Sequence, residues 1–207
     1  MSSSFTRRLA LVRMAGATAA LALACGMLFS GSALAADMPQ YAIKTSMGEI
    51  VVELDQEKAP KTVANFAAYA KSGAYNGTIF HRVIDGFMIQ GGGMNEKFEG
   101  RKTQKPIKNE SNNGLSNQPY TISMAREDNP DSATSQWFIN VADNSGIDFP
   151  FVGGSGYTVF GKVVKGQETV DKIKAVVVDD VRGMQNVPVV PIKITSVTLL
   201  KGDKLVK

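Results

Sequence analysis

Short apolar runs separated by turn residues recur along this chain, and this pattern limits the folds open to it. The runs are rich in β-branched and aromatic residues, which favour strands. Frequent glycine between the runs permits the tight turns that connect neighbouring strands. The pattern predicts one antiparallel β system. Its expected strands span residues 41–45, 49–54, 78–83, 87–90, 120–124, 136–141, 157–164 and 192–200.

Two segments have helical periodicity instead. The first begins at Ala59-Pro60 and ends near Gly73. A proline in the first helical turn costs no hydrogen bond, because an N–H at this position has no partner within the helix. The second follows Gly166 and spans residues 168–175. Two helices among many short strands predict a mainly β fold, a closed antiparallel β-barrel with helices capping its ends.

Residues 1–35 are typical of an export signal. A basic start precedes an apolar stretch and a small-x-small cleavage pattern. The apolar stretch is shorter than the roughly 20 residues that cross a bilayer. We therefore expect cleavage after Ala35, a single mature domain of residues 36–207, periplasmic localisation and no stable membrane insertion. The three parts are Arg7, Arg8 and Arg13, then residues 14–29, then Ala33-Leu34-Ala35.

Alternatives to a cleaved signal fit these residues less well. A membrane anchor would need a longer apolar stretch. A lipid on Cys25 would need a better match than Ala22-Leu23-Ala24 before it, and Cys25 lies inside the apolar stretch. The pair Arg7-Arg8 leaves open whether export follows the general secretory route or the twin-arginine route.

The composition excludes several classes of function. The chain has 23 lysines and arginines and 19 acidic residues, and removal of residues 1–35 leaves 20 basic residues against the same 19. This balance, without a basic run, argues against nucleic acid as a partner. The one cysteine is Cys25, so the mature chain suits an oxidising compartment. One histidine and no cysteine cannot build a zinc site, and we expect neither a metal nor a cofactor.

The sequence gives little support to a Ser-His-Asp hydrolase or to a phosphate-binding loop. The sequence has no Gly-x-Ser-x-Gly motif of the kind that accompanies many Ser-His-Asp triads, and its one histidine, His81, lies in a strand-like run. The glycine clusters at residues 91–93 and 153–156 lack the Lys-Ser/Thr and the helix of a phosphate loop. Glycine just after a strand more often permits a bulge or a close approach of backbone.

The segment of residues 80–92 carries an unusual combination of side chains. Strand alternation predicts that Arg82 shares a face with Phe80 and Ile84, and that Met88 and Gln90 share a face after the turn. A cation, an amide and apolar groups would then converge. From this segment alone, a binding site and a set of core residues with one surface arginine both remain open.

Residues 80–92 resemble the signature segment of the cyclophilins, which are peptidyl-prolyl cis/trans isomerases. Residues 123–125, 132–140 and 159–164 resemble later blocks of this family in the same order. The resemblance spans about residues 41–200. It implies an eight-stranded antiparallel barrel with two helices and a monomer that rotates X-Pro bonds in unfolded or partly folded polypeptides. Tyr157 and the compact loop before Asn109 resemble the exported bacterial branch, which implies a role in the folding of exported proteins.

The resemblance also implies the roles of individual residues. Catalytic residues would be Arg82, Phe87, Gln90 and Phe138. Substrate-binding residues would be Met88, Ala125, Arg126, Gln136, Ile147 and Tyr157. Among these, Phe87, Met88, Phe138 and Ile147 would line the proline pocket, and the backbone of Ala125 and Arg126 would pair with the substrate chain. Trp137, by alternation, points to the opposite face from Phe138 and belongs to the core.

One position departs from the family pattern. Gly146 stands where many cyclophilins have tryptophan or another aromatic residue. Either Phe149 or Phe151 fills that space, or the pocket is more open on this side. Because glycine lacks the indole donor and the apolar wall of tryptophan, we expect weak binding of cyclosporin, the cyclic peptide that the family binds.

A second hypothesis is a non-catalytic polypeptide-binding module or chaperone that uses the same groove. Such a protein would be expected to lose some catalytic residues. Arg82, Phe87, Gln90 and Phe138 are all present, which favours the enzyme.

Overall fold

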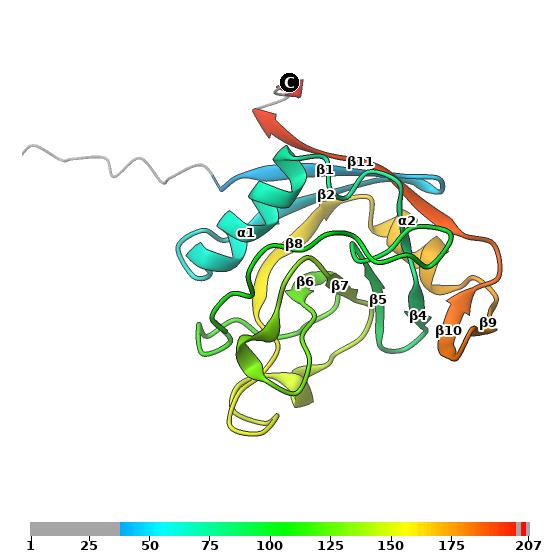
Figure 1. Cartoon of the computed structure of the whole chain (residues 1–207). Coiled ribbons are helices and arrows are strands. Elements are labelled where there is room, and N and C mark those ends of the chain that lie inside the picture. Colours follow the sequence, from blue (N-terminus) through cyan, green and yellow to red (C-terminus); the bar gives the residue numbers. More distant parts are fainter. Residues whose placement is uncertain (1–37, 202–203, 206–207) are drawn as a thin grey trace, which may run out of the picture. The chain divides into compact units, whose positions relative to one another are not determined.

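The structure, a computed structural model, describes residues 38–201 and 204–205 (Figure 1). The predicted export signal lies outside the described residues. The helices are α1 (Pro60–Lys71) and α2 (Gln167–Lys174), with short 3-10 turns at Pro130–Ser132 and Ser145–Ile147. The strands are β1 (Gln40–Thr45), β2 (Gly48–Leu54), β3 (Thr78–Phe80), β4 (Arg82–Ile84), β5 (Met88–Gly91), β6 (Thr121–Met124), β7 (Trp137–Asn140), β8 (Val159–Lys165), β9 (Val178–Val181), β10 (Met184–Pro188), β11 (Ile192–Lys201) and β12 (Lys204–Leu205).

The main sheet curves into a nearly closed antiparallel barrel. Its strand order is β12-β11-β1-β2-β8-β6-β7-β5-β4, and β3 pairs with β11. β4 stands at one end of this order, and β3, which directly precedes β4 in the chain, pairs with β11 near the other end. The chain therefore connects the two ends of the sheet. The mainly β barrel with two helices is confirmed. The strand count differs, because the run at residues 78–83 forms two strands and because β9, β10 and β12 were not predicted.

The helix α1 begins at its proline, as predicted, but lacks a capping side chain of its own. Glu110, from a distant loop, takes that role. Its carboxylate accepts hydrogen bonds from the backbone N–H groups of Lys61, at 3.1 Å, and Thr62, at 2.9 Å. Free N–H groups at a helix start need such acceptors, so this contact fixes the start of α1 to the loop.

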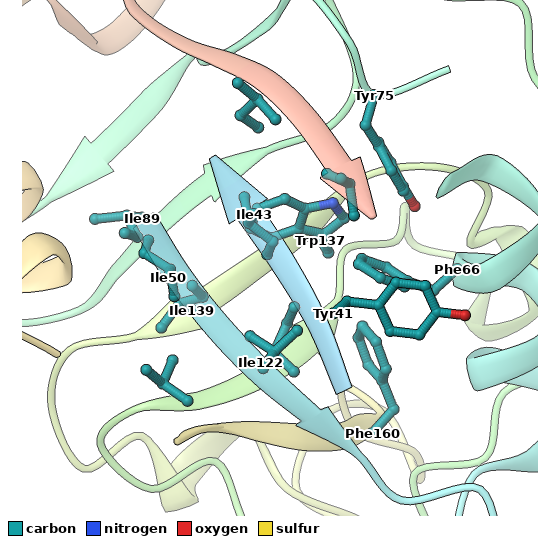
Figure 2. Packing of buried hydrophobic residues seen from close by; sticks show 14 of the residues in the cluster. Tyr41, Ile43, Ile50, Phe66, Tyr75, Ile89, Ile122, Trp137, Ile139 and Phe160 are labelled. Carbon is teal, nitrogen blue, oxygen red and sulfur yellow. The ribbon is translucent and has the colours of Figure 1, made fainter. Parts of the chain in front are cut away.

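Side chains fill the inside of the barrel (Figure 2). Trp137 is fully buried there, as predicted, and its ring meets that of Phe80 edge-on at 5.6 Å between centroids. Phe66 from α1 and Ile173 from α2 belong to the same core. A site for a large substrate therefore has to lie on the outer face.

Strand alternation breaks at His81, which belongs to neither β3 nor β4. Phe80 and Val83 both lie in the core, whereas Arg82 is half-buried and outside the core cluster. The predicted shared face of Arg82 and Phe80 is therefore wrong. The break at His81 turns Arg82 away from the core.

Within residues 38–201 and 204–205, no helix has the length and apolar character needed to cross a membrane.

Candidate active site

Three predicted catalytic side chains stand in one row across neighbouring strands. Arg82 in β4 lies opposite Gln90 in β5, and Gln90 lies opposite Phe138 in β7. Directly opposite residues of antiparallel strands project to the same side of a sheet. The strand register therefore brings together a cation, an amide and an aromatic ring on the outer face of the barrel.

The polar part of this row is held by a side-chain hydrogen bond. The amide nitrogen of Gln90 donates to the amide oxygen of Gln136 at 2.8 Å. Arg82 forms no ion pair with any residue that the structure describes. Its guanidinium donors are therefore available to a bound ligand.

The apolar part of the site surrounds Phe138. Met88 shares the outer face with Gln90, as predicted, and both Met88 and Phe138 are buried although neither belongs to the barrel core. Tyr157 meets Phe138 edge-on, with 5.7 Å between ring centroids. The backbone N–H of Tyr157 donates to the carbonyl of Ile147 at 3.0 Å, which brings Ile147 to the same side.

Phe87 is positioned by the loop that carries Gly146 and Ile147, through contacts that the sequence did not predict. Its carbonyl accepts hydrogen bonds from the Asn144 side chain, at 2.8 Å, and from the Val141 N–H, at 3.0 Å. Asp148 in turn accepts from the backbone N–H of Asn117 at 2.8 Å. These contacts hold the loop of residues 141–148 against Phe87. The many asparagines around this region were the available signal, because asparagine side chains often bond to nearby backbone.

A groove continues the site beyond Gln136. It has a volume of about 110 Å³ and is lined by Gln90, Ala125, Arg126, Glu127, Ser132, Thr134 and Gln136. The N–H of Ala125 already donates to the carbonyl of Gln136 at 3.0 Å. Only the remaining backbone polar groups of this segment can therefore pair with a substrate chain.

The Arg126 side chain is engaged within the protein. Its guanidinium lies 4.7 Å from the centre of the Tyr157 ring and donates to the hydroxyl of Ser155 at 3.1 Å and the carbonyl of Gly156 at 3.2 Å. A cation over an aromatic face is attracted by the ring quadrupole. Arg126 therefore helps to hold the Tyr157 ring, which in turn packs against Phe138.

The glycines after β5 support the site by their lack of side chains. A Cβ on Gly93 would lie 2.5 Å from Cγ of Gln136, and a Cβ on Gly92, whose φ is +82°, would lie 2.7 Å from Nε1 of Trp137. Only glycine leaves room for both side chains and readily adopts this φ at residue 92. The close packing explains the glycine cluster without a phosphate ligand.

Residues 40–199 match the family model described as cyclophilin type peptidyl-prolyl cis-trans isomerase/CLD. The chain belongs to the cyclophilin family. One relative is the peptidyl-prolyl cis-trans isomerase cyp18 of Streptomyces antibioticus. It is 51% identical over 165 residues, which cover 79% of this chain and 99% of that protein. The peptidyl-prolyl cis-trans isomerase of Acinetobacter baylyi is 51% identical over 174 residues, covering 84% of this chain and 91% of that protein.

Solved structures show the same relationship. A crystal structure of a cyclophilin type peptidyl-prolyl cis-trans isomerase from Cryptosporidium parvum has a TM-score of 0.65 and 28% identity. It covers 80% of this chain and 99% of that one. A related structure, determined in the presence of the dipeptide Ala-Pro, has a TM-score of 0.64 and covers 79% of this chain and 99% of that one. This cyclophilin is a peptidyl-prolyl cis-trans isomerase.

His81 is the neighbour of Arg82 in this cyclophilin, and it is 6% exposed. Burial lowers the pKa of His81 below its ordinary value, and the positive charge of Arg82 acts in the same direction. Its Nδ1 atom is buried without a hydrogen-bond partner among the described residues. The neutral form of His81 is therefore favoured beside the cationic Arg82.

The space beside Gly146 is open in this cyclophilin. Apart from Gly146 itself and its two chain neighbours, no described residue has a heavy atom within 4 Å of the place that a Cβ on Gly146 would take. The side chains of Phe149 and Phe151 are 47% and 71% exposed. The structure therefore agrees with the more open pocket rather than with a phenylalanine that replaces the aromatic wall.

Within residues 38–201 and 204–205 of this cyclophilin, no group of three or more His, Cys, Asp or Glu side chains is arranged to hold a metal ion.

Proposed function

We propose that this cyclophilin acts as a monomer on X-Pro bonds of exported polypeptides, outside the cytoplasm, and that Arg82, Gln90 and Phe138 carry the reaction. The row of these side chains across β4, β5 and β7 is the observation on which the proposal rests. The export pattern of residues 1–35 supports the location. The related Cryptosporidium parvum structure, determined with Ala-Pro, supports a proline-containing substrate.

The reaction requires rotation about a bond and no bond cleavage. The X-Pro amide has partial double-bond character, a barrier of about 18–20 kcal/mol, and an uncatalysed time of tens to hundreds of seconds. An enzyme accelerates this rotation if it binds the twisted amide more tightly than either planar form. A cyclophilin with no nucleophile and no general base in the site can therefore still catalyse the reaction.

Arg82 supplies the interaction that strengthens during rotation. As resonance is lost, the proline nitrogen becomes pyramidal and basic, so a guanidinium N–H near it binds the twisted state best. The pocket at Phe138 and Met88 holds the proline ring while the preceding carbonyl turns. A rate increase from about 10⁻² to about 10³ per second corresponds to roughly 7 kcal/mol. One charge-assisted hydrogen bond together with positioning is of the right size to supply this energy.

A turnover assay with an X-Pro peptide tests the catalytic part of this proposal. The cis-to-trans rate is measured with and without the protein, and peptide binding is measured separately by calorimetry. Faster isomerisation supports catalysis. Binding without acceleration would favour the non-catalytic polypeptide-binding module or chaperone.

A further inference from the structure

The tip of the β9–β10 hairpin forms a pocket with the residues around Arg82. The pocket has a volume of about 290 Å³ and is lined by His81, Arg82, Gly183, Met184 and Gln185. β10 packs beside β4, which carries Arg82 (Figure 1). Residues about a hundred positions later in the chain thus complete the surroundings of the arginine.

The position of this hairpin is fixed by contacts at its turn. Arg182 donates a hydrogen bond to the carbonyl of Lys97 at 3.0 Å, and its guanidinium lies 5.6 Å from the centre of the Phe98 ring. Within the hairpin, Met184 lies opposite Val181. The turn next to Met184 and Gln185 is therefore held against residues 97–98.

The hairpin pocket and the groove at Ala125 both adjoin the row of Arg82, Gln90 and Phe138. Arg82 lines the hairpin pocket, and its cross-strand partner Gln90 lines the groove with Gln136. Neighbouring strands are about 4.8 Å apart, and an extended chain advances about 3.3 Å per residue. A peptide lying across Arg82 and Gln90 thus needs only a few residues to reach both.

The geometry of proline indicates which part of the substrate suits the groove. Steric conflict with the proline ring holds the preceding residue extended. An extended residue suits pairing with the backbone at Ala125 and Arg126. The residue after proline is then left on the side of Arg82 and the hairpin.

We propose that the hairpin pocket is a second specificity subsite, which takes the side chain of the substrate residue that follows proline and favours an apolar side chain over a basic one. The flexible thioether of Met184 adapts to apolar side chains of different shapes. The charge of Arg82 opposes a lysine or arginine in the same space. This inference rests on the proposed isomerase reaction at Arg82.

The test uses peptides that differ only in the residue after proline, which is alanine, leucine or lysine. Catalysed cis–trans exchange is measured by NMR, which needs no coupling protease. We expect the wild-type protein to act about fivefold faster on the leucine peptide than on the alanine peptide, since partial burial of the added carbons corresponds to about 1 kcal/mol. The lysine peptide should be slower than the alanine peptide.

Met184→Ala should reduce the leucine preference, measured as the ratio of its own rates on the leucine and alanine peptides, to about twofold or less. Met47→Ala is the matched control, because Met47 is a half-buried methionine in the β1–β2 turn and lines a different pocket. It should keep the full leucine preference.

A second measurement remains valid even if Met184→Ala fails to fold. In the wild-type protein labelled at its methionine methyl groups, the leucine peptide should shift the Met184 signal and leave the Met47 signal in place. Isomerisation with no leucine preference and no Met184 shift would overturn the subsite alone. No isomerisation of any peptide would overturn the isomerase reaction and the subsite with it.

Discussion

Arg82 is half-buried, and among the described residues it has no ion-pair partner whose loss would destabilise the fold. Arg82→Ala should lower kcat/KM by about two to three powers of ten, because a donor aimed at the transition state is typically worth about 3–4 kcal/mol. The melting temperature should change little. Peptide turnover and thermal melts measure the two effects.

Arg82→Lys serves as the control for charge alone. Lysine keeps the positive charge but lacks the planar fork of donors. We expect an activity between those of the wild-type protein and Arg82→Ala. Near-normal turnover by Arg82→Ala would show that the assigned mechanism is wrong.

His81 should make the stability of the protein depend on pH. Its pKa is lowered in the folded state, chiefly by burial, so below about pH 6.5 the unfolded chain binds more protons than the folded one. Stability is therefore present above the unfolded pKa and is lost as the pH falls toward the folded pKa. The loss is at most about 1.4 kcal/mol per pH unit for one proton. Urea unfolding at about pH 7.5 and about pH 5 measures it.

His81→Gln is the matched variant, because glutamine does not titrate. It should lose less stability than the wild-type protein over the same interval. The pKa values of the Asp131 and Asp143 carboxyls are lowered in the folded protein, so these groups change the stability only below about pH 4, outside this pH interval. Equal losses in the two proteins would mean that His81 is not the titrating group.

Gly146 should determine the response to cyclosporin. Glycine offers neither an indole N–H nor an apolar wall, and the space beside it is open. Gly146→Trp should tighten inhibition by about 30- to 1,000-fold, equivalent to about 2–4 kcal/mol. Turnover of a short X-Pro peptide should change little. Cyclosporin titration of both forms in the peptide assay measures the effect, and tight inhibition of the unmodified protein would contradict it.

Residue types near the site were predictable, but some of their orientations were not. Alternation within one strand correctly separated Trp137 from Phe138. Alternation failed at His81, because a break between two strands leaves no periodic mark in the sequence. The Arg126 side chain was also beyond prediction, since its partners Ser155 and Tyr157 lie in a distant loop.

At the scale of an element, α1 depends on Glu110. Glu110→Ala should lower the free energy of unfolding by about 1–2 kcal/mol, because it removes the acceptor of the N–H groups at Lys61 and Thr62. Glu110→Gln keeps one carboxamide oxygen and should lose less. Urea unfolding of the three proteins measures the difference, and an unchanged Glu110→Ala protein would contradict the capping role.

Elements with strong local patterns were predicted, and those that depend on distant partners were missed. The β1–β2 hairpin and both helices follow from alternation, proline position and glycine stops. The β9–β10 hairpin carries acidic residues and a short glycine turn, and it is held partly by Arg182 against Lys97. No periodic pattern in the sequence of the hairpin predicts such a contact.

At the scale of the whole molecule, the chain should be processed on export. We expect intact-mass analysis of the exported protein to give a chain that begins at Ala36, since a short apolar stretch precedes a small-residue site. Fractionation of the cells should place it in the periplasm. A mass that retains residues 1–35, or a lipid on Cys25, would contradict this prediction.

The packed interior of the barrel determines how a substrate chain can reach the site. Because the proposed catalytic row lies on the outer face and the inside is filled by side chains such as Trp137, a substrate chain never has to thread through the barrel. A chain can be engaged at its middle as easily as near a terminus, and even when its two ends are joined. Prolines in exposed loops of nearly finished proteins, and in covalently closed rings, are therefore sterically accessible to the same surface.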